Sequence, residues 1–292
     1  MNDFSIRDLE NLSGIKAHTI RVWEQRYSFL RPKRTETNIR CYSNEELKVI
    51  LNIALLNKYG YKISQIDKMN EPELKQKILN LSTAEAVQDR VINELIQSMI
   101  DLDVDQFETS LDNFIFSKGI DKAITQIIFP FLERVGILWV TSNINPAQEH
   151  LVSNIIRQKI IVGIESTVTQ IRVNKTILLF LPEGAHHEIG LLYMHYLLKA
   201  RGIKVLYLGS DVPFKDIEFA ANYKKPDFLY THLTSKPRYF NLEKFLDRVS
   251  SQMPGIPLIM SGHMATVRPR KEYPTVHFKT SLQGVLEFIN SL

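Results

Sequence analysis

Residues 176–190 read TILLFLPEGAHHEIG: an apolar run, a short polar loop and the start of a second apolar stretch. The run at 176–181 has the length and composition of a buried β-strand. Similar short runs recur at 204–208, 227–233, 257–260 and 275–278, with helical stretches between them. Strands that alternate with helices predict a parallel sheet covered by helices on both faces, so we expect an α/β domain over residues 174–292.

The loop at 182–187 follows the first of these strands and carries a candidate metal ligand. Ligands on parallel sheets bind beyond the carboxyl ends of the strands. His187 lies there, with Gly190 three positions later. Neutral imidazole is a common metal ligand, and a glycine lets the backbone approach a ligand closely. Because His-x-x-Gly often arises by chance, its place after the strand is what favours a site. Four other histidines are expected to be structural or loop residues: His195, His232, His263 and His277.

Upstream of the strands the apolar residues follow a helical period with few glycines. We expect helices near 84–101, 104–117, 120–139 and 146–167, which together predict a four-helix bundle over residues 80–170. The apolar stripe in its third helix is expected to be bundle core: Ile124, Ile127, Ile128 and Phe131.

The first 75 residues predict short helices and a loop or hairpin, in the order of a winged helix-turn-helix head. Ser5 and Ser43 have the spacing of helix N-caps, and the second helix covers 16–27. That helix has a donor-bearing face and an apolar face, formed by His18, Arg21 and Gln25 and by Ile20, Trp23 and Tyr27 respectively. Such a helix can pack on its neighbour and read base edges in a major groove, while Lys16 suits a phosphate. The alternative is a small helical domain with a solvated basic face.

The distribution of charge indicates a basic N-terminal segment joined to a neutral remainder of the chain. The net charge is +4, and residues 1–70 hold 12 Lys and Arg against 8 Asp and Glu. A basic module of this kind is expected to dock on DNA phosphates. The chain has one cysteine, Cys41, which excludes an intramolecular disulfide and a cysteine-based metal cluster. With no apolar stretch of membrane-spanning length and no secretory signal at the start, we expect a cytoplasmic protein.

Three pieces of the head resemble the MerR-family winged-helix domain. They are IKAHTIRVWE at 15–24, LRPKRTETNIRCYS at 30–43 and YGYKISQI at 59–66, and their order matches as well as their composition. The resemblance implies recognition-helix contacts by Lys16, His18, Thr19 and Arg21, beside Gln25 from the helix pattern. It also implies a wing that includes Arg34, Arg40 and Tyr42 and contacts DNA through them. It further implies a dimer on a double-stranded DNA operator with inverted repeats, with RNA polymerase as a further candidate partner.

Residues 84–292 resemble the cobalamin-binding module of methionine-synthase type, which implies a helical cap followed by a flavodoxin-like domain. The combination with a MerR head resembles light-sensing repressors of the CarH/LitR type. This resemblance rests on two motifs, His187-x-x-Gly190 and Trp139 separated by nine residues from Glu149-His150. The resemblance implies a corrin between bundle and sheet, with His187 as the lower cobalt ligand. It also implies that Trp139 covers the adenosyl group and that His150 becomes the upper ligand once that group is lost. On the residues alone, a core tryptophan and a capped turn are the alternative.

The chain departs from that family's pattern at three places. The acid expected two residues before the histidine is Ala185. The Ser-x-Leu motif beside the buried nucleotide tail is Thr231-His232-Leu233, and the Gly-Gly turn is Ser261-Gly262. We therefore carry two hypotheses. The first is a DNA-binding repressor, a homodimer or homotetramer, that senses adenosylcobalamin and light. The second is a MerR-type regulator whose module has lost the cofactor and serves in oligomerisation or protein interaction. An enzyme is disfavoured, because the chain has no substrate barrel.

Overall fold

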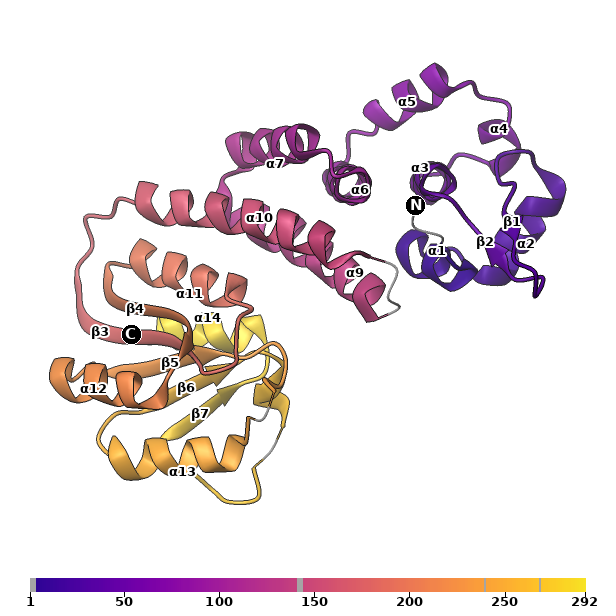
Figure 1. Cartoon of the computed structure of the whole chain (residues 1–292). Coiled ribbons are helices and arrows are strands. Elements are labelled where there is room, and N and C mark those ends of the chain that lie inside the picture. The colour runs from indigo at the N-terminus through magenta and orange to yellow at the C-terminus, as the bar shows by residue number, and fades with distance from the viewer. Residues whose placement is uncertain (1–3, 141–143, 239, 268) are drawn as a thin grey trace. The chain divides into compact units, whose positions relative to one another are not determined.

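The structure, a computed structural model, divides the chain into two compact units, Met1–Ile156 and Arg157–Leu292 (Figure 1). It describes residues 4–140, 144–238, 240–267 and 269–292, and the side chains of 137–140 are not among those described. Within these ranges, no helix combines the length and the apolar character that crossing a membrane requires.

The first unit begins with the expected winged-helix head. Its elements are α1 (Ile6–Ser13), α2 (Ala17–Arg26), β1 (Lys33–Arg34), β2 (Arg40–Cys41), α3 (Asn44–Lys58) and α4 (Ile63–Ile66). Ser5 and Ser43 each form a capping box, with Asp8 and Glu46 respectively, which satisfies backbone donors at the two helix starts. The antiparallel pair β1–β2 forms the wing. The predicted helix-turn-helix is thus confirmed.

One helix of the head was not predicted. Helix α5 covers Glu71–Leu79 and is capped by Asn70, whose side chain accepts a hydrogen bond from the backbone of Glu73 at 2.9 Å. Pro72 in the first turn and two acidic residues there are helix-start signals that the sequence does contain. The hydrophobic period does not reveal this helix, because α5 buries only Ile78 and therefore lacks a long apolar stripe.

The bundle helices follow as α6 (Ala84–Asp101), α7 (Val104–Lys118), α8 (Ile120–Ala123), η1 (Ile124–Ile128), α9 (Phe129–Val140) and α10 (Pro146–Ser166). The segment η1 is a π-helical turn between α8 and α9. The predicted apolar stripe lies in the core, since all four of its side chains are fully buried: Ile124, Ile127, Ile128 and Phe131.

Helix α6 also packs against α3 of the head, within the same compact unit. Asp89 on α6 accepts hydrogen bonds from Lys58 at 2.5 Å and from the Tyr59 hydroxyl at 2.8 Å. Near the other end of α6, Lys48 pairs with Asp101 at 2.6 Å. The winged-helix head and the bundle helix are therefore joined by charged and hydrogen-bonded contacts as well as by apolar packing.

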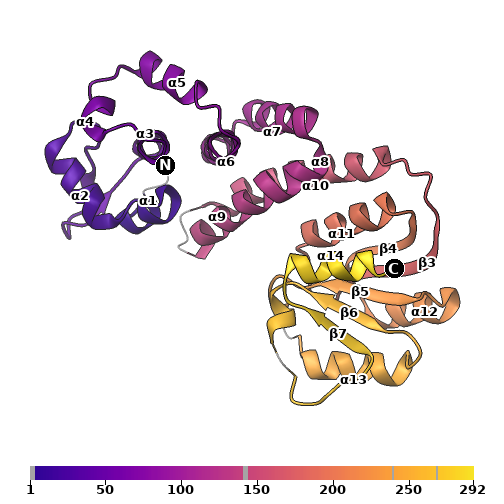
Figure 2. The same ribbon diagram turned by 180° about the vertical axis from the view of Figure 1, so that it is seen from behind.

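The second unit is a five-stranded parallel sheet in the order β4-β3-β5-β6-β7. Its strands are β3 (Val173–Pro182), β4 (Ile203–Val212), β5 (Phe228–His232), β6 (Leu258–Ser261) and β7 (Val276–Lys279). Its helices are α11 (Ile189–Ala200), α12 (Phe214–Lys224), α13 (Leu242–Gln252), η2 (His263–Thr266) and α14 (Leu282–Asn290). Helices α11 and α14 cover one face of the sheet and α12 and α13 the other (Figures 1 and 2). This strand order is that of flavodoxin-like folds, which confirms the predicted fold class.

Candidate functional site

The recognition helix α2 presents its polar face to solvent, as its period predicts. Lys16, His18, Arg21 and Gln25 are exposed, whereas Ile20 is fully buried. Trp23 lies on the buried side as well, with its ring edge-on to Phe29 at 6.2 Å between centroids. Packing therefore fixes one side of α2 and leaves the donor-bearing side free, which is the arrangement that reading a major groove requires.

Three residues that are expected to contact DNA already have partners within the head: Lys16, Thr19 and Arg34. Lys16 pairs with Glu10 at 3.3 Å, with its side chain 74% exposed, so the pair is weak and can be exchanged for a phosphate. Thr19 is half-buried, and its hydroxyl lies 3.3 Å from Nε2 of His18. In the wing, Arg34 is exposed and donates a hydrogen bond to the Asn38 side chain at 2.8 Å.

Arg40 and Tyr42 have a different place from the one the sequence suggested. The Arg40 guanidinium pairs with Glu24 of α2 at 2.9 Å, and both side chains are largely buried. Tyr42 is fully buried, and its hydroxyl donates to the same Glu24 carboxylate at 3.3 Å. Burial and the nearby carboxylate raise the pKa of Tyr42. The expectation that Tyr42 contacts DNA is therefore corrected: both residues brace the wing against α2.

In the second unit, His187 lies on the loop between β3 and α11, at the carboxyl end of β3. His186 and His187 are both exposed, and both line a pocket of about 150 Å³ formed by the loops that follow β3 and β5. In this strand order the chain reverses direction across the sheet between β3 and β5, which is where such folds bind ligands. The strand order thus places His187 at the expected point.

The loop that carries His187 is anchored by Asp211, at the end of the neighbouring strand β4. The backbone of Gly184, which has a φ of +80°, donates to the Asp211 carboxylate at 2.7 Å. The Asp211 backbone in turn donates to the Ala185 carbonyl at 3.0 Å. Asp211 itself has a φ of +58°, an uncommon conformation that these two bonds hold in place.

Glu188 fixes the other side of the loop. It is buried, accepts a hydrogen bond from the Tyr207 hydroxyl at 2.7 Å and pairs with Arg157 of α10. Burial and the Glu188 carboxylate raise the pKa of Tyr207, so the phenol remains a donor. Sequence reasoning missed Asp211, Glu188, Tyr207 and Arg157, because their pairing follows from strand order rather than from local pattern.

The position expected to hold an acid, Ala185, is buried, and no described residue hydrogen-bonds the His187 imidazole. In a histidine that binds a metal, the second ring nitrogen usually donates a hydrogen bond to a carboxylate, a carbonyl or a water. Asp211 and Glu188 therefore anchor the loop that carries His187, and no hydrogen bond within the described residues fixes its ring.

Gly190, in the first turn of α11, faces the side chain of His232 at the end of β5. A Cβ at Gly190 would lie 2.3 Å from the His232 Cδ2 atom, so only glycine fits there. The His232 Nδ1 atom is 2.8 Å from the Ser261 hydroxyl, which is also 2.6 Å from the Tyr230 hydroxyl. Burial lowers the pKa of His232 to about 4, so its ring is neutral at ordinary pH. The expectation that His232 is structural agrees with this position.

The remaining residues of the motifs Thr231-His232-Leu233 and Ser261-Gly262 differ in their surroundings. Thr231 and Ser261 are buried and do not line the pocket beside His187, whereas Leu233 does. Gly262 has a φ of +86°, and a Cβ there would lie 2.5 Å from the Leu233 carbonyl oxygen. The Thr231 hydroxyl has no hydrogen-bond partner among the described residues. Packing inside the chain alone therefore accounts for Gly262.

Of the three bundle residues expected near the cofactor, two can be described. Glu149 and His150 lie in the first turn of α10, and the His150 imidazole is 72% exposed with Nδ1 3.3 Å from Glu149. Glu149 also accepts a hydrogen bond from the Ser153 hydroxyl at 2.6 Å. The side chain of Trp139 lies outside the described residues.

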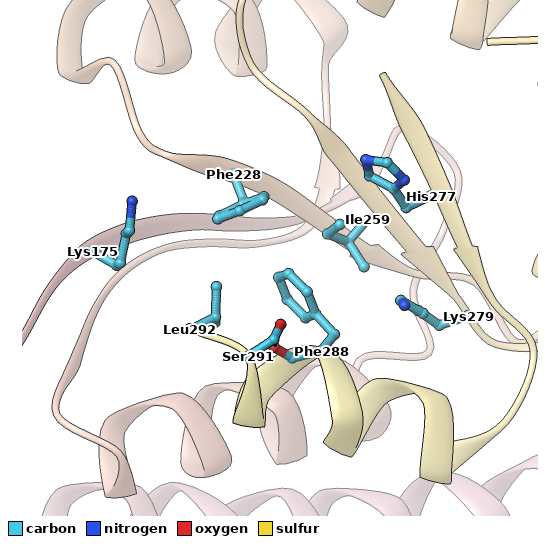
Figure 3. Close-up of a pocket in the computed structure, with 8 residues that line it drawn as sticks. All are labelled: Lys175, Phe228, Ile259, His277, Lys279, Phe288, Ser291 and Leu292. Atoms are coloured by element: carbon cyan, nitrogen blue, oxygen red, sulfur yellow. The ribbon is translucent and has the colours of Figure 1, made fainter. Parts of the chain in front are cut away.

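A larger pocket, of about 410 Å³, lies elsewhere in the same unit, between the sheet and α14 (Figure 3). Its walls include the edge-on pair Phe228–Phe288, at 5.3 Å between ring centroids, and Lys175, which is paired with Asp227 at 2.9 Å. None of its lining residues belongs to the His187 loop. Topology and ligand chemistry, rather than volume, therefore single out the smaller pocket.

The residues fit one part of cobalamin and not the other. An exposed imidazole on an anchored loop suits a cobalt ligand, and His187 supplies it. The space beside Gly190, close to the motifs where the family resemblance implies the nucleotide tail, is filled by His232. Within the described ranges, no three His, Cys, Asp or Glu side chains cluster as an independent metal site.

Comparison with protein families divides the chain into three matched segments. Residues 4–71 match the MerR HTH family regulatory protein. Residues 91–162 and 175–280 match two families that are each described as a B12 binding domain. The matched segments coincide with the head, the bundle helices and the α/β unit.

Two curated relatives span most of the chain. The HTH-type transcriptional repressor CarH of Myxococcus xanthus is 26% identical over 269 residues, which are 90% of this chain and 89% of CarH. The HTH-type transcriptional repressor CarA of the same organism is 30% identical over 226 residues, which are 76% of this chain and 73% of CarA. Among solved structures, the monomethylamine corrinoid protein of Methanosarcina barkeri matches 70% of this chain and 100% of its own, with a TM-score of 0.57 and 14% identity. That likeness concerns the fold alone.

Proposed function

Because this chain belongs to the family of HTH-type transcriptional repressors that includes CarA of Myxococcus xanthus, we propose that it is a repressor that senses adenosylcobalamin and responds to light through it. It is a MerR-type DNA-binding regulator with a B12-binding domain. Its named relatives are repressors, which points to a regulator rather than an enzyme.

The DNA-binding part of the proposal is carried by the free face of α2. Arg21 and Gln25 are exposed there and bear the donors that read base edges, with Lys16 placed for a phosphate. The wing, braced by Glu24 and Arg40, would contact the backbone through Arg34. We expect a dimer on an inverted repeat, because helix-turn-helix heads read half-sites related by two-fold symmetry.

The cofactor part is carried by one observation: an exposed imidazole, His187, on an anchored loop at the point where the sheet reverses. His187 would hold cobalt, and Asp211 and Glu188 would keep its loop in place. When bound, adenosylcobalamin supplies a cobalt–carbon bond that visible light breaks. We further propose that Trp139 covers the adenosyl group and that His150, which is exposed, takes an axial position after illumination.

A second candidate function keeps DNA binding and omits the cofactor. It is favoured by Ala185, which leaves His187 without an acidic partner, and by His232, which fills the space beside Gly190 and is held there by Ser261. In that case the second unit would serve in oligomerisation or would bind another protein.

The visible spectrum separates these candidates. The chain is purified in the dark with excess adenosylcobalamin, desalted, and measured before and after green illumination. We expect retained absorbance that changes irreversibly with light. Retained absorbance without a change would refute light sensing and leave a cobalamin sensor. If the desalted protein has no absorbance, the cofactor proposal fails and the second candidate stands.

A pair of adjacent histidines provides the matched variants. His187→Ala should change the spectrum or lose the colour, whereas His186→Ala, in the same loop and equally exposed, should retain both. DNA binding and mass by light scattering, measured in the dark and after illumination, then show whether the cofactor controls the operator and the oligomer. Equal DNA affinity of His187→Ala and the native chain in both conditions would contradict the proposed switch.

A further inference from the structure

The space on the α11 side of β5 is already occupied by side chains of this chain. The His232 ring lies against Gly190, so close that even a methyl group at Gly190 would overlap it. Its Nδ1 atom is held by the Ser261 hydroxyl at 2.8 Å. The first wall of this space is therefore a neutral imidazole whose position is set by a hydrogen bond and by contact with a helix backbone.

The second wall is equally fixed. Ser261 is buried at the end of β6 and lies 2.6 Å from the hydroxyl of Tyr230, which is itself buried. Tyr230, His232 and Ser261 thus form one connected cluster across two adjacent strands, β5 and β6. To open the space, the His232 ring would have to leave both Gly190 and Ser261. A flexible surface side chain would not oppose a ligand in this way.

The pocket that remains beside His187 is small. Its volume is about 150 Å³, which is below the range of roughly 300–1,000 Å³ that holds drug-sized ligands. His232 lines this pocket, so the cluster separates the loop that carries His187 from the space beside Gly190. A ligand bound at His187 therefore meets a closed wall on this side.

We propose that this chain takes corrinoids with the nucleotide tail outside the α/β unit, because His232, held by Ser261, occupies the space beside Gly190. It then selects for the corrin ring and gains no affinity from the nucleotide of complete cobalamin. This inference rests on the proposed cofactor site at His187. In cobalamin the tail base must also leave cobalt before His187 can bind it. The tail-less corrinoid does not carry that cost, so it should bind at least as tightly.

The test compares two corrinoids that differ only in the nucleotide. The full native chain is titrated in the dark with aquacobalamin and with aquacobinamide. Visible absorbance follows the exchange of the lower axial ligand, the tail base in aquacobalamin and a water in aquacobinamide, for the His187 imidazole. We expect dissociation constants within threefold of each other, or tighter binding of aquacobinamide. Binding of aquacobalamin tenfold or more tightly would overturn the inference, because a buried tail would then contribute to affinity.

Two histidine variants test whether His232 determines the ratio of the two dissociation constants. His232→Ala empties the space beside Gly190, and we expect it to shift the ratio of the two dissociation constants at least threefold towards aquacobalamin. His277→Ala removes an exposed histidine of the same unit and should leave the ratio as it is. An unchanged ratio in folded His232→Ala would overturn the role of His232. If neither corrinoid changes the absorbance of the native chain, the proposed cofactor itself fails, which is distinct from a ratio that favours aquacobalamin.

Discussion

Replacing Gly190 with alanine should destabilise the second unit, although alanine is the better helix former. The new Cβ would lie 2.3 Å from Cδ2 and 2.4 Å from Nε2 of His232. Non-bonded carbon atoms prefer a separation of about 3.5–4.0 Å, so the ring must move by more than an ångström. Its hydrogen bond to Ser261 and the packing around it oppose that movement.

The expected size follows from two opposing effects. Overpacking of a well-filled interior costs about 1–3 kcal/mol. Replacing glycine by alanine within a helix recovers up to about 1 kcal/mol, and less near the helix start. We therefore expect a net loss of about 1–2 kcal/mol in the free energy of unfolding.

The assay is urea unfolding followed by far-UV circular dichroism, with hydrogen exchange by mass spectrometry to assign the change to α11 and β5. Tryptophan fluorescence would not report on this unit, because the two tryptophans, Trp23 and Trp139, lie before residue 157. Gly255→Ala is the matched control, since a Cβ there meets no atom within 4 Å. It should change stability by less than about 0.5 kcal/mol.

The double variant Gly190→Ala with His232→Ala decides whether the overlap is the cause. Once the ring is absent, the methyl group at position 190 should cost little, so the two changes should be non-additive by at least about 1 kcal/mol. The packing of His232 against α11 would be refuted if Gly190→Ala were as stable as the native chain. It would also be refuted if the losses of stability in the two single variants added up in the double variant.

Three further predictions concern pH, DNA and the wing. Burial lowers the pKa of His232 from 6.5 to about 4, so as the pH falls the unfolded chain binds a proton at this residue before the folded chain does. The free energy of unfolding should therefore decrease by on the order of 3 kcal/mol between pH 6.5 and pH 4. Urea unfolding at pH 7.5 and 5 tests this, and a native pH dependence in His232→Asn would contradict it. Arg21→Ala should weaken binding to a selected operator by about 1–3 kcal/mol and relax its sequence preference, whereas Lys16→Ala should weaken all sequences alike and reduce the salt slope by about 0.9. Fluorescence anisotropy between 50 and 200 mM salt distinguishes the two, and equal losses on all sequences for Arg21→Ala would exclude base reading. Glu24→Gln removes the negative partner of the largely buried Arg40 and should lower the stability of the first unit by about 1–3 kcal/mol. Tryptophan fluorescence during heating measures this change, since both tryptophans lie in that unit. An unchanged melting temperature would mean that the wing does not depend on this pair.

Local patterns predicted the elements of the fold well. The caps at Ser5 and Ser43 and the two faces of α2 depend on residues three or four positions apart, which a sequence displays directly. Strand β4 was predicted at 204–208 and in fact continues to Val212, because its later part pairs with β3 through an irregular register. Pairing with a neighbour, rather than the apolar run, sets where that strand ends.

The candidate site was predicted only in part, for the same reason. The position of His187 follows from its place after a strand, since the carboxyl ends of parallel strands share one edge. The partners of its loop do not follow in this way. Asp211 lies 27 residues from Gly184, and His232 meets Gly190 only because β5 is adjacent to β3. In the head, Tyr42 was expected at the DNA because the motif contains it, whereas its ring fills the core.

The contact between α3 and α6 has a consequence for anyone who builds chimeras from this chain. Exchanging the head at the seemingly natural junction near residue 75 would leave Asp89 without Lys58 and Tyr59 and would leave Asp101 without Lys48. A transplanted head would then meet a foreign surface on α6, and loss of regulation in such a hybrid could be mistaken for loss of sensing. Grafts that carry α6 together with the head keep this surface intact, and they are the ones from which a new sensor can be judged.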